Sequence, residues 1–201
     1  MPGQQLNLLL FGPQGSGKGT QAKRIAAEDG VPHVSTGDMF RAAIAKQTPF
    51  GGKVEPILAA GELVPDHLTV SLVRERLSEP DAEPGFVLDG FPRNIVQAEA
   101  LDELLAELGR PLTLVLEFLI PDDVAIERLL GRAAEEGRPD DTPEAIRRRL
   151  EIYHRETAPL SDYYRASGKL VGVHADKTVE EVWAEIQQAI LQARSQAEVT
   201  A

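Results

Sequence analysis

The chain of 201 residues contains no cysteine. This absence excludes disulfide bonds, thiol catalysis and any zinc site with cysteine ligands. No apolar run approaches the roughly 20 residues that a transmembrane helix requires, and the residues before Leu6 lack the basic and apolar regions of a signal peptide. We therefore expect a cytoplasmic protein that makes no contact with a membrane.

Basic residues are scarce relative to acidic ones. Lys and Arg total 21 against 32 Asp and Glu, which gives a formal net charge of -11. An acidic chain repels the phosphates of nucleic acids, so we expect no nucleic-acid partner. A site for a phosphorylated ligand must then be made cationic locally, by arginines and lysines gathered in one place.

Short apolar runs alternate with helical patterns along the chain. Five runs have the length and continuous apolarity of buried parallel strands, namely residues 6–11, 31–34, 86–88, 112–118 and 170–173. This alternation predicts an α/β fold, a three-layer sandwich whose central five-stranded parallel sheet carries helices on both faces. A chain of this length forms a single domain, residues 1–201, and its ligands bind at the carboxyl ends of the strands.

The segment GPQGSGKGT, residues 12–20, follows the first apolar run and precedes a helical pattern. In this context the spacing G-x-x-x-x-G-K predicts a phosphate-binding loop. Its glycines let backbone N–H groups approach phosphate oxygens, the helix N-terminus adds partial positive charge, and Lys18 adds a full charge. The usual pattern has a magnesium-binding Ser or Thr directly after the lysine. Here Gly19 takes that place, and Thr20 is the candidate ligand one residue later.

The segment STGDMFR, residues 35–41, follows the second run and therefore lies beside the phosphate loop. It opens a helical insertion, roughly residues 37–60, which residues 61–65 close. Glycines at several positions allow such a small lobe to bend. The alternative is an ordinary pair of helices with a surface arginine, Arg41.

The third run ends at Asp89, in the segment GFVLDGFPR. A carboxylate at the end of a strand beside a phosphate loop can organise Mg²⁺ through water, or it can only brace the turn. Arg93 extends from the same turn toward any bound anion. Gln97 follows near the start of the helix that Asn94 begins, and its amide offers a donor and an acceptor, the pair that matches adenine. The alternative is that Gln97 is an ordinary solvated helix residue.

The arginines between 128 and 149 form the last group. Arg128 and Arg132 are four residues apart and share one face of a helix. Residues 132–141 have the composition of a loop, and the triplet Arg147, Arg148 and Arg149 belongs to the next helix. Since successive helical residues differ in direction by about 100°, the three cannot all face one site, and we expect one to be functional and the others solvated.

Six segments in order resemble the adenylate kinase family over nearly the whole chain. They are GPQGSGKGTQ (12–21), STGDMFR (35–41), GELVPD (61–66), LDGFPRNIVQ (88–97), RPDD (138–141) and RRRLEIYHRETAPLSDYY (147–164). The resemblance implies a P-loop kinase that transfers the terminal phosphoryl group of Mg-ATP to AMP, reversibly, giving two ADP. It also implies an NMP-binding lobe at 35–64, a short lid at 131–141 without zinc, and a monomer.

The resemblance further implies the roles of individual residues. ATP would be bound by Gly15, Ser16, Gly17, Lys18, Gly19, Thr20, Arg128, Arg132 and Lys177. AMP would be bound by Thr36, Arg41, Glu62, Leu63, Val64, Gly90, Phe91, Pro92, Arg93, Gln97, Arg138 and Arg149. The catalytic residues would be Lys18, Arg93, Arg128, Arg138 and Arg149, with Mg²⁺ near Asp89, through water, and Thr20. Whether Asp38, Asp140 and Asp141 contact a ligand or orient arginines stays open.

Two other functions compete with this interpretation. Pyrimidine monophosphate kinases share the loop and the turn, but they usually have Ala in place of Thr36 and Asn in place of Gln97. A GTPase-like switch would require an N-K-x-D segment and a Ser or Thr directly after the lysine, and neither occurs. Both comparisons favour an adenine-specific kinase.

Overall fold

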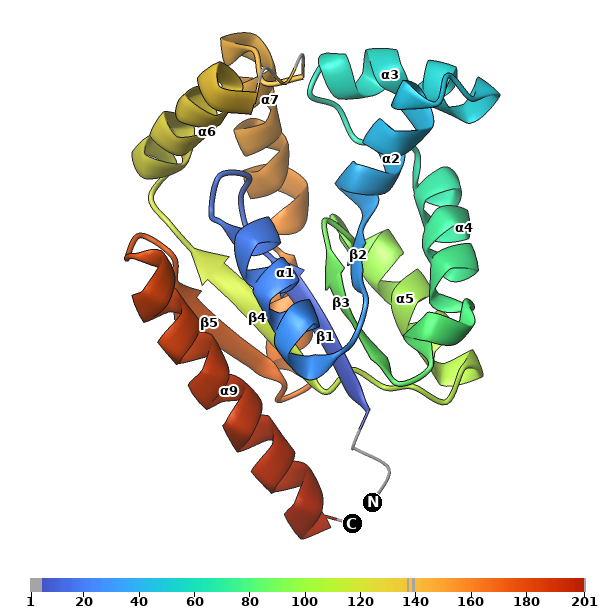
Figure 1. Cartoon of the computed structure of the whole chain (residues 1–201), viewed down its shortest axis with the longest axis vertical. Coiled ribbons are helices and arrows are strands. Elements are labelled where there is room, and N and C mark those ends of the chain that lie inside the picture. The colour runs from blue at the N-terminus through green and yellow to red at the C-terminus, as the bar shows by residue number, and fades with distance from the viewer. Residues whose placement is uncertain (1–4, 137, 139, 201) are drawn as a thin grey trace.

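The computed structural model describes residues 5–136, 138 and 140–200 (Figure 1). Its strands are β1 (Leu6–Phe11), β2 (His33–Ser35), β3 (Gly85–Asp89), β4 (Leu114–Leu119) and β5 (Leu170–His174). Its α-helices are α1 (Lys18–Asp29), α2 (Thr36–Ala45), α3 (Pro49–Ala59), α4 (Asp66–Leu77), α5 (Ile95–Glu107), α6 (Asp122–Glu136), α7 (Pro143–Ile152), α8 (Leu160–Arg165) and α9 (Val179–Thr200). A 3₁₀ turn, η1 (Pro80–Ala82), precedes β3, and a π-helical turn, η2 (Tyr153–Thr157), follows α7.

The strands form one parallel sheet in the order β2-β3-β1-β4-β5, which confirms the predicted fold class. The predicted second strand was wrong at its start. The N–H of Val31 donates to the carbonyl of Ala26 at the end of α1, and Pro32 has no N–H, so pairing begins at His33. The strand predicted at 112–118 begins at Leu114.

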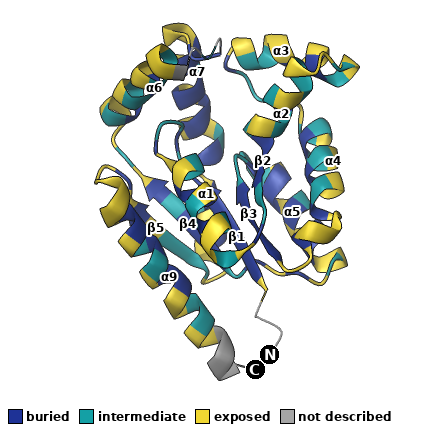
Figure 2. Cartoon of the chain, viewed as in Figure 1, coloured by how far each residue is buried: buried dark blue, intermediate teal, exposed yellow. Residues whose placement is uncertain are grey.

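Helices cover both faces of the sheet because successive residues of a strand point to opposite sides. Leu8 and Leu10 of β1 pack with Ile25 of α1 and with α9. Leu9 and Phe11 pack on the other face, with α4, α5 and α8. Figure 2 shows buried strands between helices that are buried on one side and exposed on the other.

The predicted insertion forms a lobe with its own small core. Helices α2 and α3 and the chain leading to α4 enclose Phe40, Val54 and Val64. In Figure 1 this lobe and helices α6 and α7 stand at the end of the sheet toward which the strand arrows point. No helix of the described residues is both long and apolar enough to cross a membrane.

The loop predicted for residues 132–141 was wrong in its first half. Helix α6 continues to Glu136, because Arg132 and the four residues after it, Ala-Ala-Glu-Glu, are good helix formers and contain neither Gly nor Pro. The predicted lid at 131–141 therefore begins as helix. Gly137 and Pro139, which fall within that predicted lid, lie outside the described residues, as do residues 1–4 of the predicted domain.

Candidate active site

A cavity of about 830 Å³ opens at the carboxyl ends of the strands. Its walls come from the phosphate loop, the turn after β3, the lobe, α6 and α7. Fifteen of the predicted site residues line it: Gly15, Gly17, Lys18, Gly19, Thr20, Arg41, Glu62, Asp89, Gly90, Pro92, Arg93, Arg128, Arg132, Arg138 and Arg149. The structure thus gathers residues that are up to 134 positions apart, Gly15 to Arg149, around one space.

The phosphate loop requires glycine where it touches its neighbours. A Cβ atom at Gly12 would lie 2.6 Å from the carbonyl oxygen of Phe118, and one at Gly15 would lie 2.5 Å from that of Ala125. Both glycines have positive φ. Helix α1 begins directly after the loop, and no side chain caps its first N–H groups. Those donors and the helix dipole make this end of α1 favourable for an anion.

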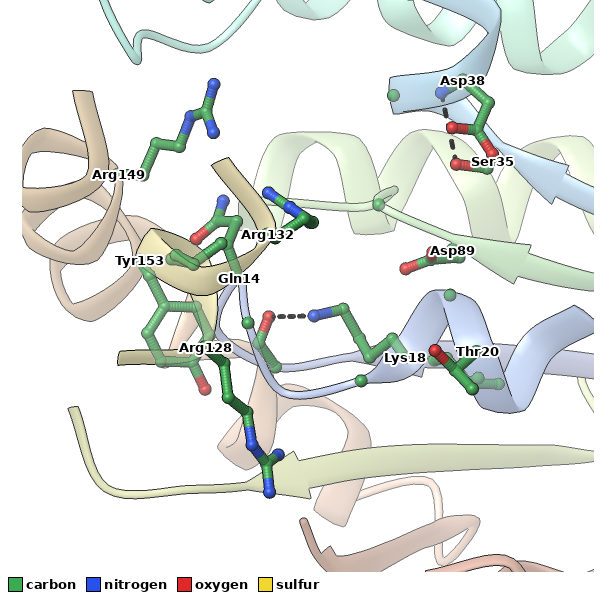
Figure 3. A pocket seen from close by; sticks show the side chains of 18 of the residues that line it. Gln14, Lys18, Thr20, Ser35, Asp38, Asp89, Arg128, Arg132, Arg149 and Tyr153 are labelled. Carbon is green, nitrogen blue, oxygen red and sulfur yellow. Dashed lines mark hydrogen bonds between the residues drawn. The ribbon is translucent and has the colours of Figure 1, made fainter. Parts of the chain in front are cut away.

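Lys18 folds back over the loop from which it extends (Figure 3). Its Nζ donates to the carbonyls of Gly12 at 2.9 Å and Pro13 at 2.8 Å, and to Ser16 Oγ at 3.1 Å. Burial lowers the pKa of Lys18 to about 8, with Asp89 opposing the shift and the nearby arginines adding to it. Lys18 therefore carries its charge at neutral pH at a cost in free energy that a bound anion would offset.

We expect the affinity of the free protein for ATP to fall as the pH rises above about 8, because the pKa of Lys18 is lowered to about 8. The protonated amine binds phosphate, and once the pH exceeds that pKa the affinity falls by up to about tenfold per pH unit. Titrations of ATP from pH 7 to 10 measure this step. Lys169→Met, which removes an amine outside the cavity, should show the same drop in ATP affinity above pH 8 as the unchanged protein. A flat profile across pH 8 contradicts this role of Lys18.

Arg93 lies on the turn that follows β3, the strand next to β1 in the sheet. Its Nε donates to the carbonyl of Gly90 at 2.8 Å. Burial lowers the pKa of Arg93 to about 10, and Arg149 adds to the shift while Asp89 opposes it. Neither Arg93 nor Lys18 forms an ion pair with any residue that the structure describes. Two half-buried cations without a paired carboxylate define a site for an anion.

Arg132 of α6 and Arg149 of α7 are held by two aspartates. Asp141 accepts from Arg132 Nε at 2.8 Å and from Arg149 Nη1 at 2.7 Å, and its side chain is fully buried. Asp140 accepts from Arg149 Nη2 at 2.8 Å and lies 3.9 Å from Arg41 Nη1. Burial opposes ionisation of Asp140, but Arg149 outweighs it and holds the pKa of that carboxyl below its usual value. Within the described residues, these aspartates orient arginines.

Asp141→Asn should lower the free energy of unfolding by about 3 kcal/mol, because it leaves two guanidiniums without their buried carboxylate. Urea unfolding measures the loss. Asp38→Asn is the matched control, since Asp38 also pairs with an arginine, Arg41, but is 52% exposed. That variant should lose less than about 1 kcal/mol. Equal losses in both variants would show that burial of Asp141 is not what matters.

Arg128 is placed differently from the other arginines. Its guanidinium donates to the carbonyls of Ala175 at 2.7 Å and Lys177 at 3.5 Å. Figure 3 shows it on the opposite side of the phosphate loop from Arg132 and Arg149. The side chain of Lys177 pairs with Glu185, so only the backbone of Lys177 faces Arg128. Arg128 therefore ties α6 to the segment after β5.

Seven predicted site residues do not line the cavity: Ser16, Thr36, Leu63, Val64, Phe91, Gln97 and Lys177. Some of them support its wall. Ser16 accepts a hydrogen bond from Lys18, and Thr36 donates to the carbonyl of Gly90 at 2.9 Å. Val64 and Phe91 pack in the hydrophobic cores.

Oxygen ligands for a divalent cation are available beside Lys18. Figure 3 places the carboxylate of Asp89 and the hydroxyl of Thr20 on the same side of the loop as the lysine amine. A Cβ atom at Gly19 would lie 3.8 Å from Asp89 Oδ2, so this carboxylate stands close to the start of α1. Among the described residues no group of three or more acidic or histidine side chains could hold a metal. This donor set fits Mg²⁺, which binds through few carboxylates and takes its other ligands from phosphates and water.

Sequence reasoning did not single out several other residues of the cavity wall, among them Gln14 and Tyr153. Gln14 belongs to the loop motif, in which any variable position can face the ligand. Tyr153 lies four residues, about one helical turn, after Arg149, and that spacing could have revealed it. Burial raises the pKa of Tyr153 to about 12, so its hydroxyl stays protonated.

A phosphate loop at the end of β1, gathered around one cavity with arginines from several other segments, defines a P-loop phosphotransferase. Comparison with known proteins narrows this class. The family model described as adenylate kinase matches residues 10–169. The adenylate kinase of Cyanothece sp. is 47% identical over 189 residues, covering 94% of this chain and 97% of the relative. That of Stenotrophomonas maltophilia is 45% identical over 185 residues, covering 92% and 99%.

The adenylate kinase of Parvibaculum lavamentivorans is 48% identical over 185 residues, covering 90% of each chain. With a family model that spans most of the sequence and relatives matched over nearly their full length, the chain belongs to the adenylate kinase family. It is a phosphotransferase with adenylate kinase activity.

Proposed function

We propose that this cavity binds Mg-ATP and AMP end to end and that the terminal phosphoryl group passes directly between them, giving two ADP. The observation that carries this proposal is the pair of half-buried cations, Lys18 and Arg93, that have no paired carboxylate among the described residues and face one cavity. Lys18 belongs to the phosphate loop and Arg93 to the turn after β3. Two separate cations in one space suit two phosphorylated ligands better than one.

The phosphate loop is the proposed donor side. Backbone N–H groups of residues 15–20 and the amine of Lys18 would hold the ATP phosphates. Arg132 would add charge from α6. The guanidinium of Arg128 contacts the backbone of Ala175 and Lys177. Arg128 and this backbone would together contact the adenine of ATP. This arrangement draws the donor site from the loop, α6 and the segment after β5.

The lobe and the turn after β3 form the proposed acceptor side. Arg41 and Arg93 would bind the phosphate of AMP, since both line the cavity. Thr36 would support the AMP site through its hydrogen bond to the carbonyl of Gly90. The backbone of residues 62–64 and 90–92 would contact the nucleoside. Gln97 would read the adenine base through its amide.

Arg138 and Arg149 would bind the phosphoryl group in transit. Phosphoryl transfer has a loose transition state, so the protein aligns the two ends and stabilises spread negative charge. Guanidiniums suit this task because they donate in forked pairs. Mg²⁺, held near Asp89 and Thr20, would supply further positive charge to the ATP phosphates when bound. No general base is required.

Water competes with AMP as acceptor, so we propose that the cavity closes before transfer. The lobe at 35–64 and the lid at 131–141 are the two parts that would move. The adenylate kinase lid is a known example of an element that closes over a bound substrate. Arg41 of the lobe lies 3.9 Å from Asp140 of the lid, which places the two parts in contact. Residues of one chain would bind both nucleotides, which supports a monomer. The use of adenine nucleotides as substrates supports a cytoplasmic location.

Steady-state rates with AMP, UMP and CMP as acceptors test the proposal. With ATP as donor, AMP should be the preferred acceptor and ADP the product on both sides. A higher kcat/KM with UMP would contradict the acceptor assignment and favour a pyrimidine kinase. Formation of ADP from ATP alone at the same rate as with AMP would contradict direct transfer.

A further inference from the structure

Gln97 is 2% exposed, and both ends of its side-chain amide are bonded to the protein. Its Oε1 accepts from the backbone N–H of Arg93 at 2.8 Å, and its Nε2 donates to Asp66 Oδ1 at 2.7 Å. The same Oδ1 accepts from Asn94 Nδ2 at 3.0 Å. Asp66 is the first residue of α4 and Asn94 is the N-cap of α5, two helices that lie side by side in Figure 1.

These contacts fix which way the amide points. A backbone N–H can only donate, and a carboxylate can only accept. Turning the amide of Gln97 by 180° would place its N–H groups against the N–H of Arg93. It would also place its oxygen against the carboxylate oxygen of Asp66. The oxygen is therefore directed to the turn after β3 and the nitrogen to α4.

The two contacts leave half of the amide available. A glutamine amide has two N–H donors and two acceptor lone pairs. One of each is used by Asp66 and Arg93, and one N–H donor and one acceptor lone pair remain unused by these contacts. Adenine presents an amino donor next to a ring-nitrogen acceptor, and hypoxanthine presents the swapped pair, a carbonyl acceptor next to a ring N–H. A fixed amide can satisfy the first arrangement by one approach and cannot reverse itself to suit the second.

We infer that Asp66 is a positioning residue that sets the base specificity of the acceptor site by holding the amide of Gln97 in one orientation. The inference rests on the proposed function, in which Gln97 reads the adenine of AMP. Asp66 lies two residues after the segment at 62–64 that is proposed to contact the nucleoside, so it also joins that segment to Gln97. Neither the charge of Asp66 nor its second oxygen is needed for this task, because Oδ1 accepts both hydrogen bonds.

The test compares AMP with inosine monophosphate, in which hypoxanthine replaces adenine, as acceptors for Asp66→Ala and Asp66→Asn. Asp66→Ala should raise KM for AMP and lower the kcat/KM ratio of AMP to inosine monophosphate by up to about tenfold, the effect of one hydrogen bond. KM for ATP and kcat at saturating AMP should stay within about threefold, since the donor site and the arginines are untouched. Asp66→Asn retains an accepting Oδ1 and should keep the ratio of the unchanged protein.

Three outcomes would overturn the inference. The first is an unchanged ratio in Asp66→Ala, and the second is an equal loss in Asp66→Asn, which would assign the effect to charge at the start of α4. The third is a loss of thermal stability in Asp66→Ala with no change in ratio, which would leave only a structural role. Gln97→Leu separates this failure from that of the proposed function. If Gln97→Leu leaves the ratio unchanged, Gln97 does not read the base; if it lowers the ratio and Asp66→Ala does not, only the role of Asp66 fails.

Discussion

Lys18→Met is expected to lower kcat by about 10³-fold, because it removes a preorganised cation from the phosphate loop. The lysine stem and methionine have similar length, so the loop keeps its packing. The carbonyls of Gly12 and Pro13 lose their common donor. That loss should lower the free energy of unfolding by about 1–2 kcal/mol, too little to unfold a domain of this size. Single-turnover rates of ADP formation and urea unfolding separate the two effects.

The matched control is Lys169→Met. Lys169 also donates from its amine to a backbone carbonyl, that of Leu112 at 2.6 Å, but it lies outside the cavity. This variant should lose similar stability and keep the rate of the unchanged protein. A Lys18→Met rate within about tenfold of normal would remove Lys18 from the mechanism.

Arg93→Ala is expected to lower kcat/KM for AMP by about 10²- to 10³-fold, the usual cost of one lost preorganised donor. The fold should not suffer. Burial and the charge of Arg149 hold the pKa of Arg93 down at about 10, so its charge is unfavourable in the empty protein. Removing it should leave the melting temperature unchanged or raise it slightly, as often happens when a functional charge is deleted.

Kinetics with AMP varied at saturating ATP, together with thermal melts, measure both effects. Arg74→Ala is the control, because Arg74 is a half-exposed arginine paired with Glu107 far from the cavity. It should change neither kcat nor KM. A strongly lowered melting temperature in Arg93→Ala would mean that Arg93 holds the turn rather than the acceptor.

The fold and the phosphate loop were predictable because local patterns specify them. The run 6–11, the glycines of residues 12–19 and the helix that follows are adjacent in sequence, and their geometry follows from backbone sterics and strand periodicity. For the triplet 147–149 the helical spacing predicts only that the three arginines cannot all face one site, and the family resemblance alone singled out Arg149. In the structure Arg149 is buried, while Arg147 pairs with Glu144 at the surface.

The remainder of the site depends on residues far apart in sequence. The contacts of Asp141 with Arg132 and Arg149 require α6 and α7 to pack as they do, and no spacing rule predicts that packing. The bond from Asp66 to Gln97 crosses 31 positions. The end of α6 was misplaced for a different reason: Gly137 and Pro139 suggested an early loop, while the helix propensity of the residues before them extended the helix to Glu136.

The central claim is that one cavity of one chain holds both nucleotides in line. Its most direct test is calorimetric titration with a bisubstrate mimic, two adenosines joined by a chain of five phosphates, followed by competition with ATP and with AMP. One molecule of the mimic should bind per chain and exclude both ATP and AMP. Its affinity should be greatly reduced in both Lys18→Met and Arg93→Ala. Binding of two molecules per chain, or exclusion of ATP while AMP still binds, would contradict it.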